Sequence, residues 1–136
     1  MLSAEHRRQG EELAETLRAQ SAECAAAAKE TSGFPATLLQ DVADMADELA
    51  GYISSPLVEE AIVRFHDSPE ARREASKDLT AYLRAAGLEV SDRASFQLRD
   101  NNWCAQLVLT VLTEGSEISI GGHYDSDSGW GTGACP

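Results

Sequence analysis

Apolar residues recur at steps of three and four through much of the chain, which is the spacing that places side chains on one face of a helix. The pattern is clearest over residues 36–53, where the apolar positions are Leu38, Leu39, Val42, Met45, Ala46, Leu49 and Ile53. The opposite face carries Asp41, Asp44, Asp47 and Glu48. Because no histidine accompanies these carboxylates, we expect them to form the solvated face of an amphipathic helix rather than a metal or acid–base site.

Three further helices are predicted on either side of this one. Residues 4–30 are rich in Glu, Gln and Ala and have a thin apolar face, so we expect a helix that docks weakly or frays. Two more helices are expected to begin at Ser55-Pro56 and at Ser68-Pro69, since Ser favours the N-cap and Pro the first helical position. The last of them is expected to end at Gly87. Short helices joined by short connections predict a small bundle.

The period changes from helical to alternating after Leu88. Ala94, Phe96 and Leu98 alternate with polar residues, and the stretch 103–112 is rich in Val, Leu and Thr. A second turn at 114–116 leads to a short segment around Ser119. The sequence therefore predicts an α+β fold, a small helical bundle packed on a two- or three-stranded antiparallel sheet.

The last sixteen residues have a different composition, because they contain five of the 10 glycines. From Gly121 onward no aliphatic residue is larger than alanine, so a flexible Gly-rich C-terminal tail is expected. The predicted organisation is an N-terminal acidic helix (residues 1–33), a helical plus β domain (residues 34–122) and the tail (residues 123–136).

Charge and cysteine usage restrict the class of protein. A net charge of −12 argues against nucleic-acid binding and against binding to anionic membranes. Cys24, Cys104 and Cys135 are widely spaced, which favours neither a disulfide framework nor a zinc site and makes a reduced cytoplasmic location the expectation. The longest apolar run, 107–112, is far below the roughly 20 residues of a membrane span, so no membrane insertion is expected.

No catalytic constellation is visible, and the chain is not expected to be an enzyme or to bind a cofactor or metal. His6, His66 and His123 have no Ser or Cys at nucleophile spacing, and no P-loop, GxSxG or HExxH is present. His66 is interpreted as a helix cap and Cys104 as a buried thiol. A calcium loop at Asp125 and Asp127 lacks the further ligands of an EF-hand.

The pair Gly121-Gly122 has two interpretations. It is either a hinge after the last strand or a protease site, at which two residues without side chains let an extended backbone enter a narrow cleft. Cleavage after Gly122 would release residues 123–136. The groups there that an enzyme could modify are Ser126, Ser128, Trp130, Thr132 and Cys135, and a dehydrated Ser or Thr could form a thioether ring with the cysteine.

Residues 62–112 resemble the nitrile hydratase-like leader peptides of ribosomally synthesised, post-translationally modified peptides. The resemblance lies in DSPEARREASKDLTAYLRAAGLEV, with the corner Ala86-Gly87-Leu88-Glu89-Val90, and in FQLRDNNWCAQLVLTVL. It implies a folded leader that is recognised by modifying enzymes and removed after a double glycine by a peptidase fused to an exporter. Gly121 and Gly122 match that cleavage position. Nitrile hydratase activity is not implied, because its metal site needs a cluster of cysteines.

Two hypotheses about function follow. In the first, the chain is such a precursor, cytoplasmic before processing, with modifying enzymes and a peptidase-bearing exporter as partners and an exported core peptide as product. In the second, it is a small acidic protein–protein interaction module, with a homodimer through the helix of residues 36–53 as one form, and the tail is only a linker. An enzyme with a site assembled from distant residues is the third alternative.

Overall fold

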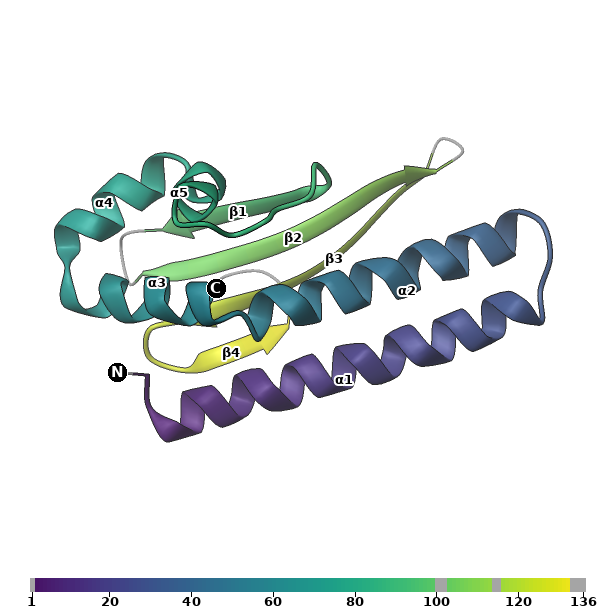
Figure 1. The fold of residues 1–136 in the computed structure, drawn as a ribbon, viewed down its shortest axis with the longest axis horizontal. Coiled ribbons are helices and arrows are strands. Elements are labelled where there is room, and N and C mark those ends of the chain that lie inside the picture. Colours follow the sequence, from purple (N-terminus) through teal and green to yellow (C-terminus); the bar gives the residue numbers. More distant parts are fainter. Residues whose placement is uncertain (1, 100–102, 114–115, 133–136) are drawn as a thin grey trace.

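The computed structural model describes residues 2–99, 103–113 and 116–132 (Figure 1). The described helices are α1 (Ala4–Lys29), α2 (Phe34–Ile53), α3 (Pro56–Asp67), α4 (Pro69–Lys77) and α5 (Leu79–Ala85). The described strands are β1 (Ala94–Arg99), β2 (Cys104–Thr113), β3 (Ser116–Asp125) and β4 (Gly129–Thr132). The α+β prediction is confirmed, and the sheet has four strands where two or three were expected. None of the described helices combines the length and the apolar character of a membrane span.

Helices α1 and α2 form a long antiparallel hairpin. The Ser3 side chain caps α1 by accepting a hydrogen bond from the His6 amide. The two helices approach closely because small residues face each other: Ala14 and Ala43 are each only 1% exposed, and the Ser21 hydroxyl donates to the Ala43 carbonyl across 2.6 Å. The expectation that the first helix docks only weakly is therefore wrong, since alanine permits tight packing without a broad apolar stripe.

The Ser-Pro signals set the starts of α3 and α4. The Ser55 hydroxyl accepts from the Leu57 amide, and the Ser68 hydroxyl accepts from the Ala71 amide. The predicted single helix from Pro69 to Gly87 is wrong, because an additional N-cap interrupts it. Asp78 has an extended backbone, and its carboxylate accepts from the Ala81 amide, which starts α5 in a new direction.

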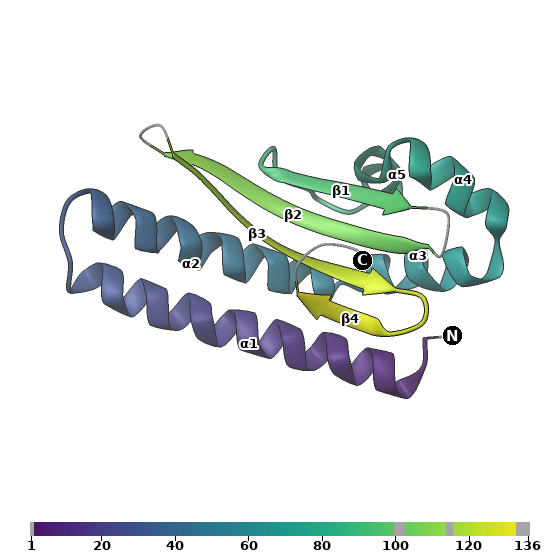
Figure 2. The ribbon, with the colours of Figure 1, turned by 180° about the vertical axis from the view of Figure 1, so that it is seen from behind.

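The sheet is an antiparallel meander in the order β1-β2-β3-β4. Helices α1, α2 and α3 lie on one face of it, as the two opposite views show (Figures 1 and 2). Strand β1 pairs with residues 104–109 of β2, and β4 pairs with residues 122–125 of β3. We call this four-stranded part the proximal sheet. The remaining described residues of these two strands, 110–113 of β2 and 116–121 of β3, have no described strand on their outer side, and we call them the distal hairpin.

The core lies between the proximal sheet and the helices. Its largest fully buried side chains are Tyr124, Phe65, Met45, Leu49, Ile62 and Leu109. The expectation of a flexible tail is wrong for residues 123–132, which complete β3 and form β4. Tyr124 is 0% exposed, and the predicted domain boundary after Gly122 falls within a strand. Aromatic side chains supply the burial that the missing aliphatic residues could not.

Candidate functional site

The double glycine lies inside β3, paired with β2 through Val108 and Leu107. Gly122 is buried and also pairs with Thr132 of β4. A Cβ atom on Gly122 would lie at ordinary contact distance from Ile53 and Leu13, 3.7 and 3.9 Å away, so α1 and α2 pack next to β3 at this point. In the folded chain the pair lies within a paired strand and is neither a hinge nor an exposed extended segment.

Trp130, which was predicted to lie in a flexible tail, packs against α1. A Cβ atom on Gly10 would lie 2.9 Å from Cδ1 and Nε1 of Trp130, so the indole occupies the space that this glycine leaves. The Trp130 amide donates to the Gln9 side chain across 3.2 Å. The indole ring also meets the Tyr124 ring edge to face at 5.4 Å. Trp130 is therefore a structural anchor between β4 and α1.

The other predicted modification sites are dispersed. Ser126 and Ser128 lie in the turn between β3 and β4, Thr132 is exposed at the end of β4, and Cys135 lies outside the described residues. The Asp125 carboxylate accepts from the amides of Asp127 and Ser128 at 2.8 and 3.2 Å. These bonds give the spacing of the two aspartates a role in the turn, and no described group of His, Cys, Asp or Glu is placed to hold a metal ion.

The described cysteines differ in state. Cys104 is buried, 3% exposed, and disulfide-bonded, so its interpretation as a free buried thiol is wrong, as is the expectation that no disulfide forms. Cys24 is a free cysteine on α1. The wide spacing of the cysteines along the chain did not predict this disulfide.

The densest group of titratable side chains surrounds Tyr124. Its hydroxyl lies 2.7 Å from Nδ1 of His6 and 3.0 Å from Nε2 of His66. His6 comes from α1, His66 from the end of α3 and Tyr124 from β3, so three distant segments meet at one oxygen. Trp103 stacks on the Tyr124 ring with centroids 5.5 Å apart. The His66 side chain thus binds Tyr124, and its predicted role as a helix cap is replaced by this contact.

Proton counting shows what this group can do. The phenol has one proton, so it donates to one imidazole and accepts from the other, an arrangement that requires at least one neutral histidine. Burial, followed by the positive charge of His6, lowers the pKa of His66. Burial and the nearby Asp125 carboxylate raise the pKa of Tyr124 to about 12. The lowered pKa of His66 and the raised pKa of Tyr124 both favour the neutral forms of these two groups. The hydrogen bonds of Tyr124 to His6 and His66 form a clasp that joins α1, α3 and β3.

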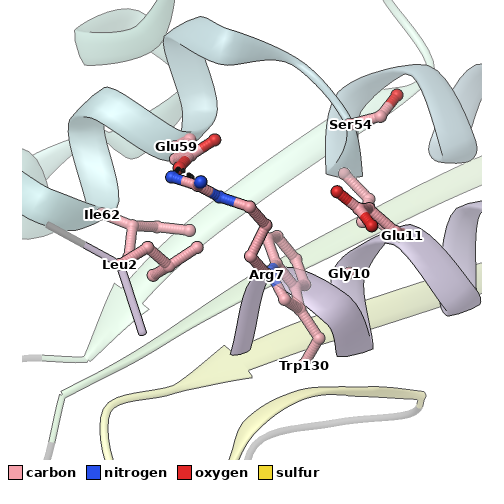
Figure 3. A pocket seen from close by; sticks show the side chains of 9 residues that line it. Leu2, Arg7, Gly10, Glu11, Ser54, Glu59, Ile62 and Trp130 are labelled. Atoms are coloured by element: carbon pink, nitrogen blue, oxygen red, sulfur yellow. Dashed lines mark hydrogen bonds and ion pairs between the residues drawn. The ribbon is translucent and has the colours of Figure 1, made fainter. Parts of the chain in front are cut away.

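A small cavity lies next to Trp130, between the start of α1 and the junction of α2 and α3 (Figure 3). Its volume is about 100 Å³, and its lining includes Leu2, Arg7, Glu11, Glu59, Ile62 and Trp130. The Arg7 guanidinium donates to the Glu59 carboxylate, Nη2 to Oε1 across 2.5 Å, at its mouth. The cavity is smaller than the several hundred Å³ of typical ligand sites. We assign it no ligand.

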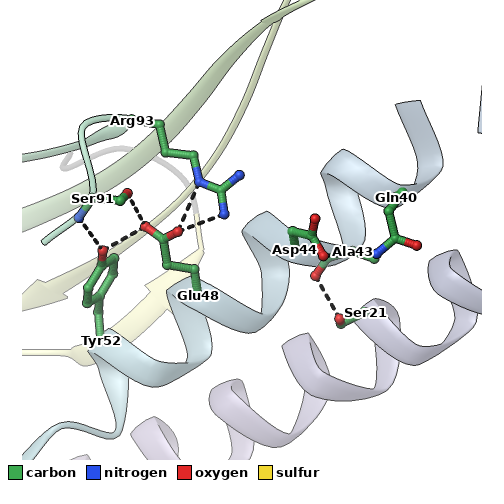
Figure 4. Close-up of polar contacts among 8 residues, drawn as sticks. All are labelled: Ser21, Gln40, Ala43, Asp44, Glu48, Tyr52, Ser91 and Arg93. Carbon is green, nitrogen blue, oxygen red and sulfur yellow. Dashed lines mark hydrogen bonds and ion pairs between the residues drawn. The ribbon is translucent and has the colours of Figure 1, made fainter. Parts of the chain in front are cut away.

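Glu48 joins α2 to the segment before β1 (Figure 4). Its carboxylate accepts from the hydroxyls of Tyr52 and Ser91 at 2.6 and 2.5 Å, and from the Arg93 guanidinium at 2.7 and 2.9 Å. Burial by itself would raise the pKa of Glu48, but the bonds from Ser91, Tyr52 and Arg93 outweigh it and hold this pKa below its ordinary value. Glu48 was predicted to be solvated, and the structure makes it a bridge instead.

A mostly apolar groove lies beside the sheet at the end of β4. It has a volume of about 370 Å³ and is bounded by α1, α2 and the edge of β3. Its lining comprises Leu17, Gln20, Glu23, Cys24, Val42, Ala46, Leu49, Ile120, Gly121 and Thr132. We call it the distal groove. The periodicity of residues 36–53 predicted the apolar face of α2, but nothing in the sequence showed that part of this face stays open.

The comparisons with known proteins add no relative. No protein-family model, curated protein or solved structure matches this chain.

Proposed function

We propose that this chain is an acidic protein-binding module whose partner docks in the distal groove. The observation that carries this proposal is an apolar hollow of about 370 Å³ between α1, α2 and the edge of β3, at a place where the helices and the sheet diverge. Open apolar hollows with a polar rim are typical of interaction surfaces. The clasp formed by Tyr124, His6 and His66 lies at the other end of the sheet, where it joins α1, α3 and β3.

Charge identifies the kind of partner. The whole chain has a net charge of −12. Glu23 lines the groove, and the exposed Glu117 lies farther along β3, the strand whose residues Ile120 and Gly121 line the groove. Surfaces of opposite sign associate faster, whereas two copies of this chain repel each other. The favoured partner is therefore a protein with a basic surface rather than a second copy.

Site-specific photo-crosslinking tests the proposal. A photoreactive residue in place of Gln20, which lines the groove, should crosslink to one protein in cells. The same residue in place of Glu74 on α4 should not crosslink to that protein. The captured protein is then purified and titrated against the chain. Equal capture from both positions, or a purified protein that binds equally well when Val42 is replaced by Glu, would contradict a groove-bound partner.

A second candidate function is the peptide precursor that the double glycine and the leader-like region favour. Strand β4 is only 4 residues long and lies at the edge of the sheet, so it can leave without disrupting β1 and β2. Cleavage after Gly122 would still require Tyr124 to leave the core. A modifying enzyme or the peptidase would have to bind an opened form of the chain.

Mass spectrometry separates the two candidates. The precursor releases residues 123–136 when the chain is co-expressed with its peptidase, and replacing Gly122 by Ala blocks the release. The module remains intact under the same conditions. Deleting residues 121–136 cannot distinguish the two, because the deletion removes Tyr124 and Trp130 from the fold.

A further inference from the structure

The outer edge of the distal hairpin has no strand beside it among the described residues. Strand β4 pairs with residues 122–125 of β3 and ends at Thr132, whereas β3 extends back to Ser116. Strand β3 therefore continues past the end of β4 (Figure 2), and Ile120 and Gly121 of this stretch line the distal groove. Unpaired strand edges carry backbone donors and acceptors that another chain can use.

Two hydrogen bonds determine which backbone groups point outward. The Ser126 amide donates to the Trp103 carbonyl, toward β2. The Trp130 amide, opposite Tyr124 in the ladder, points away from β3 and donates to Gln9. Even-numbered residues of β3 therefore direct their backbone groups toward β2, and odd-numbered residues direct theirs toward the outer edge. By this alternation Glu117, Ser119 and Gly121 direct their N–H and C=O groups toward the outer edge, where no described strand residue pairs with them.

The side chains of this edge also alternate. Ile118 and Ile120 are partly buried and pack against the core beneath the helices, whereas Glu117 and Ser119 are exposed. A strand laid beside them would direct every second side chain into the apolar groove and the others toward Glu117. The occupant that fits is an extended segment in which apolar and basic residues alternate.

The other edge of the sheet is without a neighbouring strand over a shorter stretch, residues 110–113 of β2. The Thr110 amide, which follows the end of the β1 pairing, already donates to the Arg93 carbonyl across 3.0 Å. Helix α5 lies against β1 itself, since the Phe96 amide donates to the Thr80 hydroxyl. The chain itself thus covers this edge as far as Thr110, whereas the β3 edge is open among the described residues over 116–121 and borders the distal groove.

We infer that the partner adds an extended, basic segment as a strand to the outer edge of β3, along Glu117, Ser119 and Gly121, with its apolar side chains in the distal groove. This inference rests on the proposed function and specifies how the partner is held. Main-chain hydrogen bonds supply affinity in such strand addition, and pockets for alternate side chains supply specificity. The acidic rim favours basic residues at the exposed positions.

A defined peptide tests the inference without the natural partner. The probe is a fluorescent peptide of alternating valine and lysine, titrated against the full chain by anisotropy. Its matched control is the same peptide N-methylated on every second residue, which keeps the charge but cannot complete a ladder. We expect the control to bind at least about tenfold more weakly, the loss of roughly 1.4 kcal/mol.

Substitutions in the chain test the same edge. Ser119→Pro removes one outward N–H and leaves the β2 ladder intact, as an edge proline can, and Ser119→Ala keeps the N–H while losing the contact with Thr110. We expect Ser119→Pro to weaken binding about tenfold and Ser119→Ala to leave it unchanged. Thermal unfolding and circular dichroism verify that both variants fold. An alternating valine–glutamate peptide should not bind.

The outcomes separate the inference from the proposed function. Equal binding of the probe and its N-methylated control, or of Ser119→Pro and Ser119→Ala, would overturn strand addition. If the partner crosslinked at Gln20 nevertheless binds both Ser119 variants equally, the groove remains its docking site and only the strand geometry fails. If neither the peptide nor a crosslinked protein binds, both proposals fail together.

Discussion

The two ends of the β2–β3 hairpin differ in how the rest of the chain uses them. At the proximal sheet, β1 and β4 flank the hairpin, and Tyr124, His6 and His66 clasp three segments together. At the distal hairpin the two strands pair only with each other, and Leu112 is 77% exposed. The same pair of strands is thus a core element at one end and an open surface at the other. We expect side chains of the proximal sheet to contribute most of the free energy of unfolding, and the distal hairpin to bind the partner.

The largest expected effect follows from deleting the centre of the clasp. Tyr124→Ala removes a fully buried aromatic ring and should lower the free energy of unfolding by about 3–5 kcal/mol. The distal control, Leu112→Ala, should change it by less than about 0.5 kcal/mol, because the side chain is already exposed. Urea unfolding measures both, and similar losses in the two variants would contradict the contrast.

Two glycines on the helices should respond to the same substitution in different ways. A side chain at Gly10 collides with Trp130, so Gly10→Val should cost about 1–3 kcal/mol of unfolding free energy through overpacking. Nothing lies within 4 Å of a Cβ atom at Gly51, so Gly51→Val should stay within about 0.5 kcal/mol of the parent. The intensity and wavelength of tryptophan fluorescence should change only in the first variant.

The Glu48 bridge should have an intermediate effect. Glu48→Ala leaves the donors on Tyr52, Ser91 and Arg93 without their acceptor and should cost about 1–2 kcal/mol. Asp44→Ala, on the exposed part of the same helix, is the matched control and should be nearly neutral. Because the pKa of Glu48 is lowered in the folded chain, its contribution should disappear as pH falls through that pKa. Urea unfolding from neutral to acidic pH measures both effects.

The smallest expected effect is a pH dependence of the clasp. The pKa of His66 is lower in the folded chain than its ordinary value of 6.5, so the unfolded chain binds the proton more tightly. Stability should therefore be fully present above pH 6.5 and decrease as pH falls below it. His66→Gln should flatten this dependence, whereas His6→Gln should reduce it only in part, because burial, the larger cause of the lowered pKa of His66, remains. A profile unchanged in both variants would show that another group carries it.

Local sequence patterns were sufficient to predict most of the helices and to predict that strands follow them. Steps of three and four identified α2, and Ser-Pro pairs identified the starts of α3 and α4, because these signals act within a few residues. Asp78 was missed as a cap because the apolar period continues across it. The Tyr124 cluster could not be predicted, since His6 and Tyr124 are 118 positions apart and neither has a distinctive neighbour.

The glycine-rich end of the chain shows where sequence stops being informative. This end of the chain contains small residues and few aliphatic ones. That composition is equally compatible with a flexible tail and with a close-packed strand. The difference depends on surfaces supplied by other segments: Gly10 on α1 makes room for Trp130, and Leu13 and Ile53 approach Gly122. Local periodicity and caps determined which residues form helices and strands. Tertiary structure alone decided which glycines are packing positions and which strand edge stays open, because both depend on contacts between distant parts of the chain.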